Sequence, residues 1–395
     1  MQNKQLYTRQ FWLLCFSSFL FFASFNILIP ELPSYLSDMG GEEYLGWIIG
    51  LFTISAGLSR PFSGKLTDTI GRIPIMIYGV FVCIIAGILY SHVTTVFGLL
   101  ALRLVHGMST GFKPTATSAY VADISPDHRR GEAMGILGMF GGLGMAMGNT
   151  ISSWIVMNYS INAMFYTSSG LALASILVLF GMKETLEKKQ KFNFSLLKVS
   201  LIDIYEPRAL PAAITMGLSV FSFGIALTLI PDLSEHLGLE NKGIFFGIFM
   251  SASIVIRLIA GKLSDKYGRI PVLISGLVML SFTMFLIGAS TNLKLLYIAA
   301  VIFGFAAGIN SPTIFAWTID LAEDKYRGRA LATVFIALEI GIGSGAFISG
   351  AIYDSNPKNF SYAFWTGGIV ALIAVFVSIY YFRKSRKLAT ENYES

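Results

Sequence analysis

Long apolar runs are the feature that most narrows the folds open to this chain. Nearly uninterrupted runs extend from Phe11 to Ile29, from Ile75 to Tyr90 and from Val272 to Gly288. Runs of about 20 residues are what a helix needs to cross a hydrocarbon core ~30 Å thick. The composition agrees, because 54% of the residues are hydrophobic and 13% are charged, against roughly 25% charged in a soluble domain. The sequence therefore predicts an integral membrane protein.

These runs give twelve predicted membrane-spanning helices, separated by turns that carry Gly, Pro or charge. They lie at about 10–30, 44–63, 74–92, 96–122, 131–157, 161–182, 209–231, 243–262, 272–290, 293–320, 329–353 and 360–382. The predicted fold class is all-α. An even number of spans places both termini on the same side of the membrane.

The basic residues predict which side that is, because cytoplasmic loops retain an excess of Lys and Arg. With the N-terminus inside, the inner segments hold most of the 29 Lys and Arg residues, including the tail "RKSRK". We therefore expect a multi-pass protein of the inner or plasma membrane with both termini in the cytoplasm. The net charge of +6 then reflects orientation and a preference for the membrane surface, and not binding of nucleic acid.

A dozen residues occur twice in nearly the same form. "GKLTDTIGRIPI" begins at Gly64 and "GKLSDKYGRIPV" begins at Gly261, an offset of 197. The same offset also relates Arg60 to Arg257, Gly107 to Gly304, Gly111 to Gly308, Asp123 to Asp320 and Arg130 to Arg327. The chain is therefore a duplicated six-helix unit. The predicted halves are 1–182 and 209–395, the second with a short basic tail, and the polar segment 183–208 is a cytoplasmic linker.

The repeated stretch resembles the signature G-x-L-x-D-x-x-G-R of the major facilitator superfamily, and the likeness covers essentially the whole chain. The resemblance implies two parallel six-helix halves and transport by alternating access. The pattern also has a physical interpretation. Gly64 and Gly71 leave room for a tight turn and tolerate positive φ, and Asp68 supplies a carboxylate, which a helix N-terminus favours by ~0.3–2 kcal/mol.

The resemblance further implies a conformational latch on the cytoplasmic side. Asp68 would meet the start of the eleventh helix near Arg329, and Arg72 would reach Asp123. The corresponding residues that would brace the second half are Gly261, Asp265, Gly268 and Arg269. Such a latch should stabilise the outward-open state and break when the protein opens inward.

Glycines are concentrated in the fifth and eleventh predicted helices. Gly144 with Gly148, and Gly341 with Gly345, have the spacing that lets membrane helices approach closely. Drug exporters of the family carry a Gly-Pro pair in the fifth helix. This chain has "GGLGMAMGN" there, without proline, and so departs from that subgroup.

Charged residues within the spans are candidates for the substrate and proton pathway, because a charge near the bilayer centre costs ~2.5–3.5 kcal/mol or more. The five candidates are Arg103, Lys113, Glu31, Asp232 and Glu339. Glu31 and Asp232 occupy equivalent places in the two halves, which also fits helix-end groups at the outer mouth. The other three align with Ala300, Asn310 and Gly142. Charges that break the repeat are the better transport candidates.

Two interpretations of these three charges stay open. Lys113 and Glu339 can form a structural ion pair, since each lies about ten residues from the cytoplasmic end of its helix. Alternatively, Arg103 and Lys113 favour an anionic or zwitterionic substrate, with Glu339 or Glu31 as the protonatable group, so that substrate and proton compete. "RLVHGMSTG", which contains Arg103, is also similar to the family's fourth-helix signature, whose arginine is linked in the family to proton coupling.

Motifs of other functions are misplaced or missing. "GMSTG" at Gly107 matches G-x-S-x-G but falls within a predicted helix, whereas hydrolase chemistry needs a strand-turn-helix elbow. The sequence contains no Walker A motif, and its four histidines are scattered. We therefore expect no enzyme activity, no metal and no cofactor, with a proton gradient as the energy source.

The sequence thus predicts a secondary active transporter, specifically a proton-coupled exporter of small organic molecules. The alternatives are a proton-coupled importer of a small metabolite and a transport-inactive receptor or scaffold. The expected partners are the lipid bilayer and the small-molecule substrate, and a monomer is the family default.

Overall fold

The computed structural model describes residues 6–41, 44–200, 204–239, 244–354 and 356–394. Within these residues it contains twelve long α-helices and one short helix, α2 (Leu32–Asp38). The long helices are α1 (Arg9–Asn26), α3 (Leu45–Thr69), α4 (Arg72–Tyr90), α5 (Val96–Ile124), α6 (Arg130–Asn158), α7 (Ile161–Leu179), α9 (Leu210–His236), α10 (Ile244–Tyr267), α11 (Arg269–Gly288), α12 (Leu293–Leu321), α13 (Arg327–Tyr353) and α14 (Phe360–Glu394). Each corresponds to one predicted span, which confirms the all-α, twelve-helix fold.

Nine of the long helices in the described residues are long and apolar enough to cross a membrane on composition alone. The remaining three are α1, α3 and α5. Polar side chains lower their apolar content, most clearly in α5, where Arg103, His106 and Lys113 are all buried. Polar groups inside a membrane helix normally face the protein interior and mark functional sites. These three helices are therefore expected to carry functional residues.

The chain forms two compact units. The first contains Met1–Pro126, Ile136–Glu206 and Ala322–Phe335, and the second contains Asp127–Gly135, Pro207–Leu321 and Ile336–Ser395. The units thus follow the two sequence halves except at two places. The start of α6 belongs to the second unit, and the start of α13 belongs to the first.

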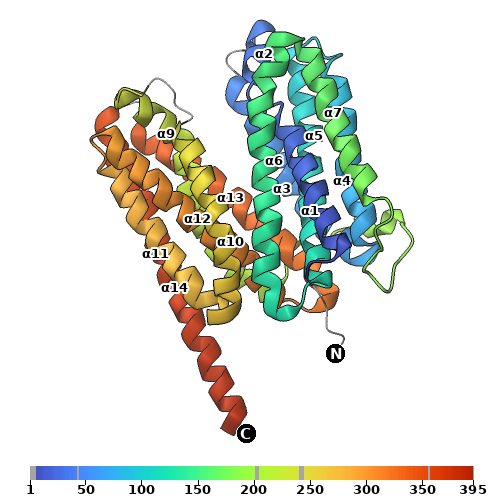
Figure 1. Cartoon of the computed structure of the whole chain (residues 1–395), viewed down its shortest axis with the longest axis vertical. Coiled ribbons are helices and arrows are strands. Elements are labelled where there is room, and N and C mark those ends of the chain that lie inside the picture. Colours follow the sequence, from blue (N-terminus) through green and yellow to red (C-terminus); the bar gives the residue numbers. More distant parts are fainter. Residues whose placement is uncertain (1–5, 42–43, 201–203, 240–243, 355, 395) are drawn as a thin grey trace. The chain divides into compact units, whose positions relative to one another are not determined.

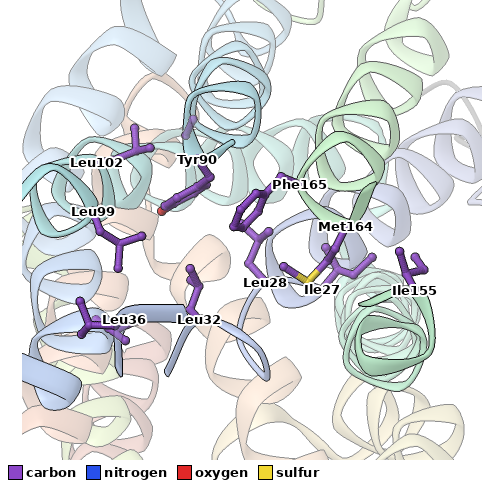
Figure 2. Packing of buried hydrophobic residues seen from close by; sticks show 12 residues of the cluster. Ile27, Leu28, Leu32, Leu36, Tyr90, Leu99, Leu102, Ile155, Met164 and Phe165 are labelled. Carbon is purple, nitrogen blue, oxygen red and sulfur yellow. The ribbon is translucent and has the colours of Figure 1, made fainter. Parts of the chain in front are cut away.

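In the first unit, α5 packs on α3 and α4, and α7 packs on α1 and α4 (Figure 1). Glycine permits the closest contact, because a Cβ atom at Gly107 of α5 would lie 2.1 Å from the Phe52 carbonyl oxygen of α3. At one end of this unit, α2 closes an apolar cluster. Figure 2 shows Leu32 and Leu36 of this cluster, with Tyr90 of α4 and Phe165 of α7.

The second unit repeats this packing. Its α12 packs on α10 and α11, and its α14 packs on α9 and α11. A Cβ atom at Gly304 of α12 would lie 2.4 Å from the Phe249 carbonyl oxygen of α10. Gly304 and Phe249 are the residues offset by 197 from Gly107 and Phe52, so the sequence repeat reproduces individual helix contacts.

The predicted close packing of the glycine-rich helices is confirmed. In the first unit, a Cβ atom at Gly144 of α6 would lie 2.2 Å from the Phe19 carbonyl oxygen of α1. In the second, a Cβ atom at Gly345 of α13 would lie 2.1 Å from the Phe221 carbonyl oxygen of α9. Real Cβ atoms do not approach this closely, so both contacts require glycine.

Candidate functional site

Asp68 lies in the last turn of α3 and binds the start of α13. Its carboxylate accepts hydrogen bonds from the backbone N–H groups of Gly328, at 2.8 Å, and Arg329, at 2.9 Å. The first N–H groups of a helix have no partner within it, and the helix dipole favours an anion there. The contact expected from the family resemblance is therefore present within the first unit.

Arg72, at the start of α4, continues this network. Its Nε donates to Asp123 at 3.0 Å, and one terminal nitrogen donates to Asp68 at 3.1 Å. Arg327 of α13 donates to the other Asp123 oxygen at 2.8 Å. The Arg72 side chain is 2% exposed and that of Asp123 is 12% exposed. Each buried carboxylate is therefore matched by a guanidinium, which buried charges require.

The second unit contains the same network at the offset positions. Asp265 accepts hydrogen bonds from the backbone N–H groups of Gly131 and Glu132, both at 2.9 Å. Arg269 binds Asp265 and lies 2.8 Å from Asp320. Arg130 corresponds to Arg327 and binds Asp320 at 2.9 Å. Arg130 and Arg327 were visible in the sequence repeat, but their place in the network was not predicted.

The glycines of the motif have two different roles. Gly71 and Gly268 form the turns and have φ of +132° and +91°, conformations that side chains disfavour. Gly64 was expected in the turn as well, but it lies inside α3, where a Cβ atom would approach that of Ala332 to 2.8 Å. Gly261 lies inside α10 in the same way, against the Gly131 carbonyl oxygen. The helices continue through most of the motif because its residues, other than the turn glycine, are compatible with a helix.

The linker adds groups that the sequence did not indicate. The Glu184 carboxylate accepts from the backbone N–H groups of Arg72 at 3.0 Å and Ile73 at 2.9 Å, and so caps α4. Thr185 donates to Asp123 at 2.6 Å. Glu206, near the end of the linker, pairs with Arg329 at 2.9 Å. A polar linker gives no pattern from which these contacts could be read.

The two buried cations of α5 lie inside the first unit. Arg103 donates from Nε to the Ile48 carbonyl at 2.8 Å, and its guanidinium carbon lies 4.4 Å from the centre of the Phe52 ring. Lys113 donates to the Ser17 carbonyl at 2.8 Å and lies 4.6 Å from the Phe21 ring centre. Neither forms an ion pair with a carboxylate among the described residues.

The three candidate carboxylates come from other elements than α5. Glu31 is half-buried, directly precedes α2 and accepts a hydrogen bond from Ser153. It was expected at the end of the first helix, but α1 ends earlier, at Asn26. Asp232 is exposed in α9, and Glu339 is half-buried in α13. Glu339 and Lys113 belong to different units, and their ion pair stays a prediction.

The carboxylates of Asp68 and Asp265 can hold the starts of α13 and α6. Four backbone N–H groups bind two carboxylates, and charge-assisted bonds of this kind contribute ~1.5–3 kcal/mol each. Within the described residues, no group of three or more His, Cys, Asp or Glu side chains could hold a metal ion. The chemistry that these residues supply is therefore ionic contact between carboxylates, guanidinium groups and helix N-termini.

Comparisons with known proteins find a matching family and similar sequences. The model of the Major Facilitator Superfamily matches residues 14–240 and 212–394. A homologue of the multi-drug resistance efflux pump PmrA from Lactococcus lactis subsp. lactis (strain IL1403) is 27% identical, covering 84% of each chain. Multidrug resistance protein 2 of Bacillus subtilis (strain 168) is 25% identical, covering 95% of each chain.

A solved structure shares the fold. The crystal structure of the human organic anion transporter MFSD10 (TETRAN) superposes with a TM-score of 0.83, at 18% identity. The match covers 94% of this chain and 99% of that one.

Proposed function

This chain belongs to the major facilitator superfamily and is a multi-pass membrane transporter of small molecules; from that premise we propose that it exports small organic molecules in exchange for protons. Its relatives in Lactococcus lactis and Bacillus subtilis are named as multidrug resistance proteins, and they match it over most of their length. Their names support export over uptake as the direction. The cell membrane is the proposed location, with both termini in the cytoplasm.

The observation that carries the mechanism is the paired binding of helix starts by Asp68 and Asp265. Asp68, from the first half of the sequence, holds the start of α13, and Asp265, from the second half, holds the start of α6. Alternating access requires contacts of this kind to form in one state and break in another. We assign them as the cytoplasmic latch of the outward-open state, and substrate or proton binding supplies the energy that releases it.

The proposed substrate is anionic or zwitterionic. Arg103 and Lys113 are buried cations without a carboxylate partner in the described residues, and a buried charge is costly without a counter-charge. A substrate anion supplies that counter-charge when the transport cycle gives it access. Glu339 or Glu31 is the proposed proton carrier, and neutralising Glu339 should then change the pH dependence of transport.

Growth of an efflux-deficient bacterium tests the proposal. Cells expressing the chain are challenged with toxic anionic, zwitterionic and cationic compounds, beside cells expressing Asp68→Asn at an equal level. The amide keeps the size of the side chain but removes the charge that binds the α13 N-terminus, so protection should be lost. Asp38→Asn is the matched control, because Asp38 is exposed at the end of α2.

The outcomes separate the candidate functions. Protection that Asp68→Asn abolishes and Asp38→Asn retains supports export through a latch. Increased sensitivity of cells with the parent protein indicates uptake of the toxic compound. No effect of well-expressed protein on any compound favours the receptor or scaffold alternative. Protection against cationic compounds alone contradicts the substrate charge assigned from Arg103 and Lys113.

A further inference from the structure

A polar cluster lies at the centre of the first unit. His106 of α5 is fully buried, with Nδ1 3.3 Å from the Tyr90 hydroxyl and Nε2 3.2 Å from the Cys83 sulfur. Its ring meets the Phe52 ring edge to face, with centroids 5.4 Å apart. Arg103 lies one turn earlier in α5 and is 2% exposed. One terminal nitrogen of Arg103 has no hydrogen-bond partner in the described residues.

The second unit shows that the fold does not need this polarity. At the offset of 197, the positions of Cys83, Tyr90, Arg103 and His106 hold Leu280, Ile287, Ala300 and Phe303. All four of these apolar residues are buried. The ring of Phe303 meets that of Phe249 at 5.1 Å, as the ring of His106 meets that of Phe52. The same helix packing therefore encloses apolar side chains in the second unit and titratable side chains in the first.

We propose that His106 is a proton-binding group of the transport cycle, an inference that rests on the proton-coupled transport proposed above. A neutral imidazole has one N–H donor and one bare acceptor nitrogen, whereas a protonated imidazole donates from both. The Tyr90 hydroxyl and the Cys83 thiol can each donate or accept. When a proton adds to the bare nitrogen, the group that had donated to that nitrogen rotates to accept. The cluster thus accommodates the proton without movement of its heavy atoms.

Arg103 links this proton to a helix contact. The groups facing His106 are Cys83 and Tyr90 from α4, the apolar Phe52 from α3 and the Arg103 guanidinium from its own helix. A proton on His106 and the Arg103 guanidinium carry like charges, so they repel each other while Arg103 is held against α3 by Ile48 and Phe52. Movement of Arg103 away from α3, for example towards a substrate anion, therefore favours proton uptake. By reciprocity, the proton weakens the contact between Arg103 and α3.

Two substitutions distinguish a proton-binding role of His106 from a packing role. His106→Phe introduces the side chain that the second unit carries at this position, so it should fold. His106→Gln keeps hydrogen-bonding capacity without a titratable group. His92→Gln is the control, because His92 is exposed just after α4. Everted membrane vesicles measure transport of the fluorescent anion calcein driven by a pH gradient, and downhill calcein flux without a gradient.

Gradient-driven calcein transport should fall by about 100-fold or more in both His106 variants, the size of loss expected when a proton-transfer group is removed. Downhill flux should persist, and the pH dependence should become flat. In parallel, nitrogen-15 NMR of histidine-labelled protein in nanodiscs follows the His106 ring, assigned by its absence in His106→Gln. Over a titration from about pH 8 to about pH 4, the ring should gain a proton at a higher pH with calcein present than without it, because the anion draws Arg103 away from His106.

The two readouts distinguish failure of this inference from failure of the proposed function. A His106 ring that stays neutral throughout the titration overturns the inference, whether or not calcein is transported. Equal pH dependence of transport in His106→Phe and the parent also overturns it. A parent that moves no calcein while His106 titrates counts against the proposed function but supports the proton site. Loss of gradient-driven transport with His92→Gln unaffected supports both.

Discussion

At the scale of single residues, the two charge networks are equivalent in connection but not in burial. Asp123 in the first unit is 12% exposed and accepts bonds from Arg72, Arg327 and Thr185. Asp320 in the second unit is 31% exposed and pairs with Arg269 and Arg130. The linker residue Thr185 accounts for part of this difference, since it contacts Asp123 directly. The same substitution should therefore have unequal effects at the two positions.

We expect Asp123→Asn to lower the free energy of unfolding by ~3 kcal/mol, because it leaves two largely buried guanidinium groups short of a counter-charge. Asp320→Asn should cost ~1 kcal/mol, because solvent screens the remaining charges. Thermal unfolding of both variants and the parent, in the same detergent, measures the difference. Equal destabilisation of the two variants would show that burial does not decide the strength of these pairs.

At the scale of the helices, a glycine predicts a close helix contact only if it lies on the face of the helix that packs against a neighbour. Gly345 of α13 lies against the Phe221 carbonyl of α9, whereas Gly343 has no neighbour within 4 Å of a Cβ atom. The sequence presents the two positions alike, two residues apart. Their difference comes from the helical period, which turns one towards α9 and the other away.

The different surroundings of Gly345 and Gly343 allow a matched pair of substitutions to test the packing. Gly345→Ala should destabilise the protein by ~1–3 kcal/mol, because the added methyl group forces α13 away from α9. Gly343→Ala should stay within ~0.5 kcal/mol of the parent. Melting temperatures in detergent, and expression at the membrane, provide the measurement. A similar loss in both variants would mean that glycine acts there through helix propensity and not through packing.

The elements themselves were largely predictable. Every long helix was expected from its apolar run, and the family resemblance implied the contact of Asp68 with the start of α13 and that of Arg72 with Asp123. One error has the opposite sense, since α1 ends at Asn26, before its apolar run does; the others lie where a polar sequence continues a helix, as at the end of α3, which runs to Thr69. Hydropathy marks where a helix leaves the hydrocarbon, not where its hydrogen bonding ends. The same limit applies to α14, which continues to Glu394 through the basic tail.

At the scale of the whole molecule, duplication explains most of the structure and the departures from it indicate function. Helix contacts, motif glycines and charge networks recur at one offset, so one half predicts the other. Among the described residues, the features without a counterpart in the other half include the buried cations of α5, the cluster around His106, and the linker. Single-sequence reasoning identified the cations, since charge in an apolar span is conspicuous. It missed the linker contacts, because they depend on where a loop folds back.

The linker is tied to the first unit through Glu184, and this attachment can be tested. Its carboxylate accepts from four backbone N–H groups, two in α4 and two at Thr185 and Leu186. Glu184→Ala removes all four acceptor contacts, so the linker should open more often. A loss of ~1.4 kcal/mol corresponds to about a tenfold increase in the open population, and proteolysis reports that population when opening is fast.

Limited trypsin digestion of the detergent-solubilised protein measures the effect, because Lys188 and Lys189 in the linker are exposed. Cleavage there should be about tenfold faster in Glu184→Ala than in the parent. Glu187→Ala is the control, since Glu187 is an exposed acid of the same segment. If both variants are cut at the parental rate, the capped α4 start does not restrain the linker. Faster cleavage in Glu184→Ala alone would make this carboxylate the attachment point of the linker to the first charge network.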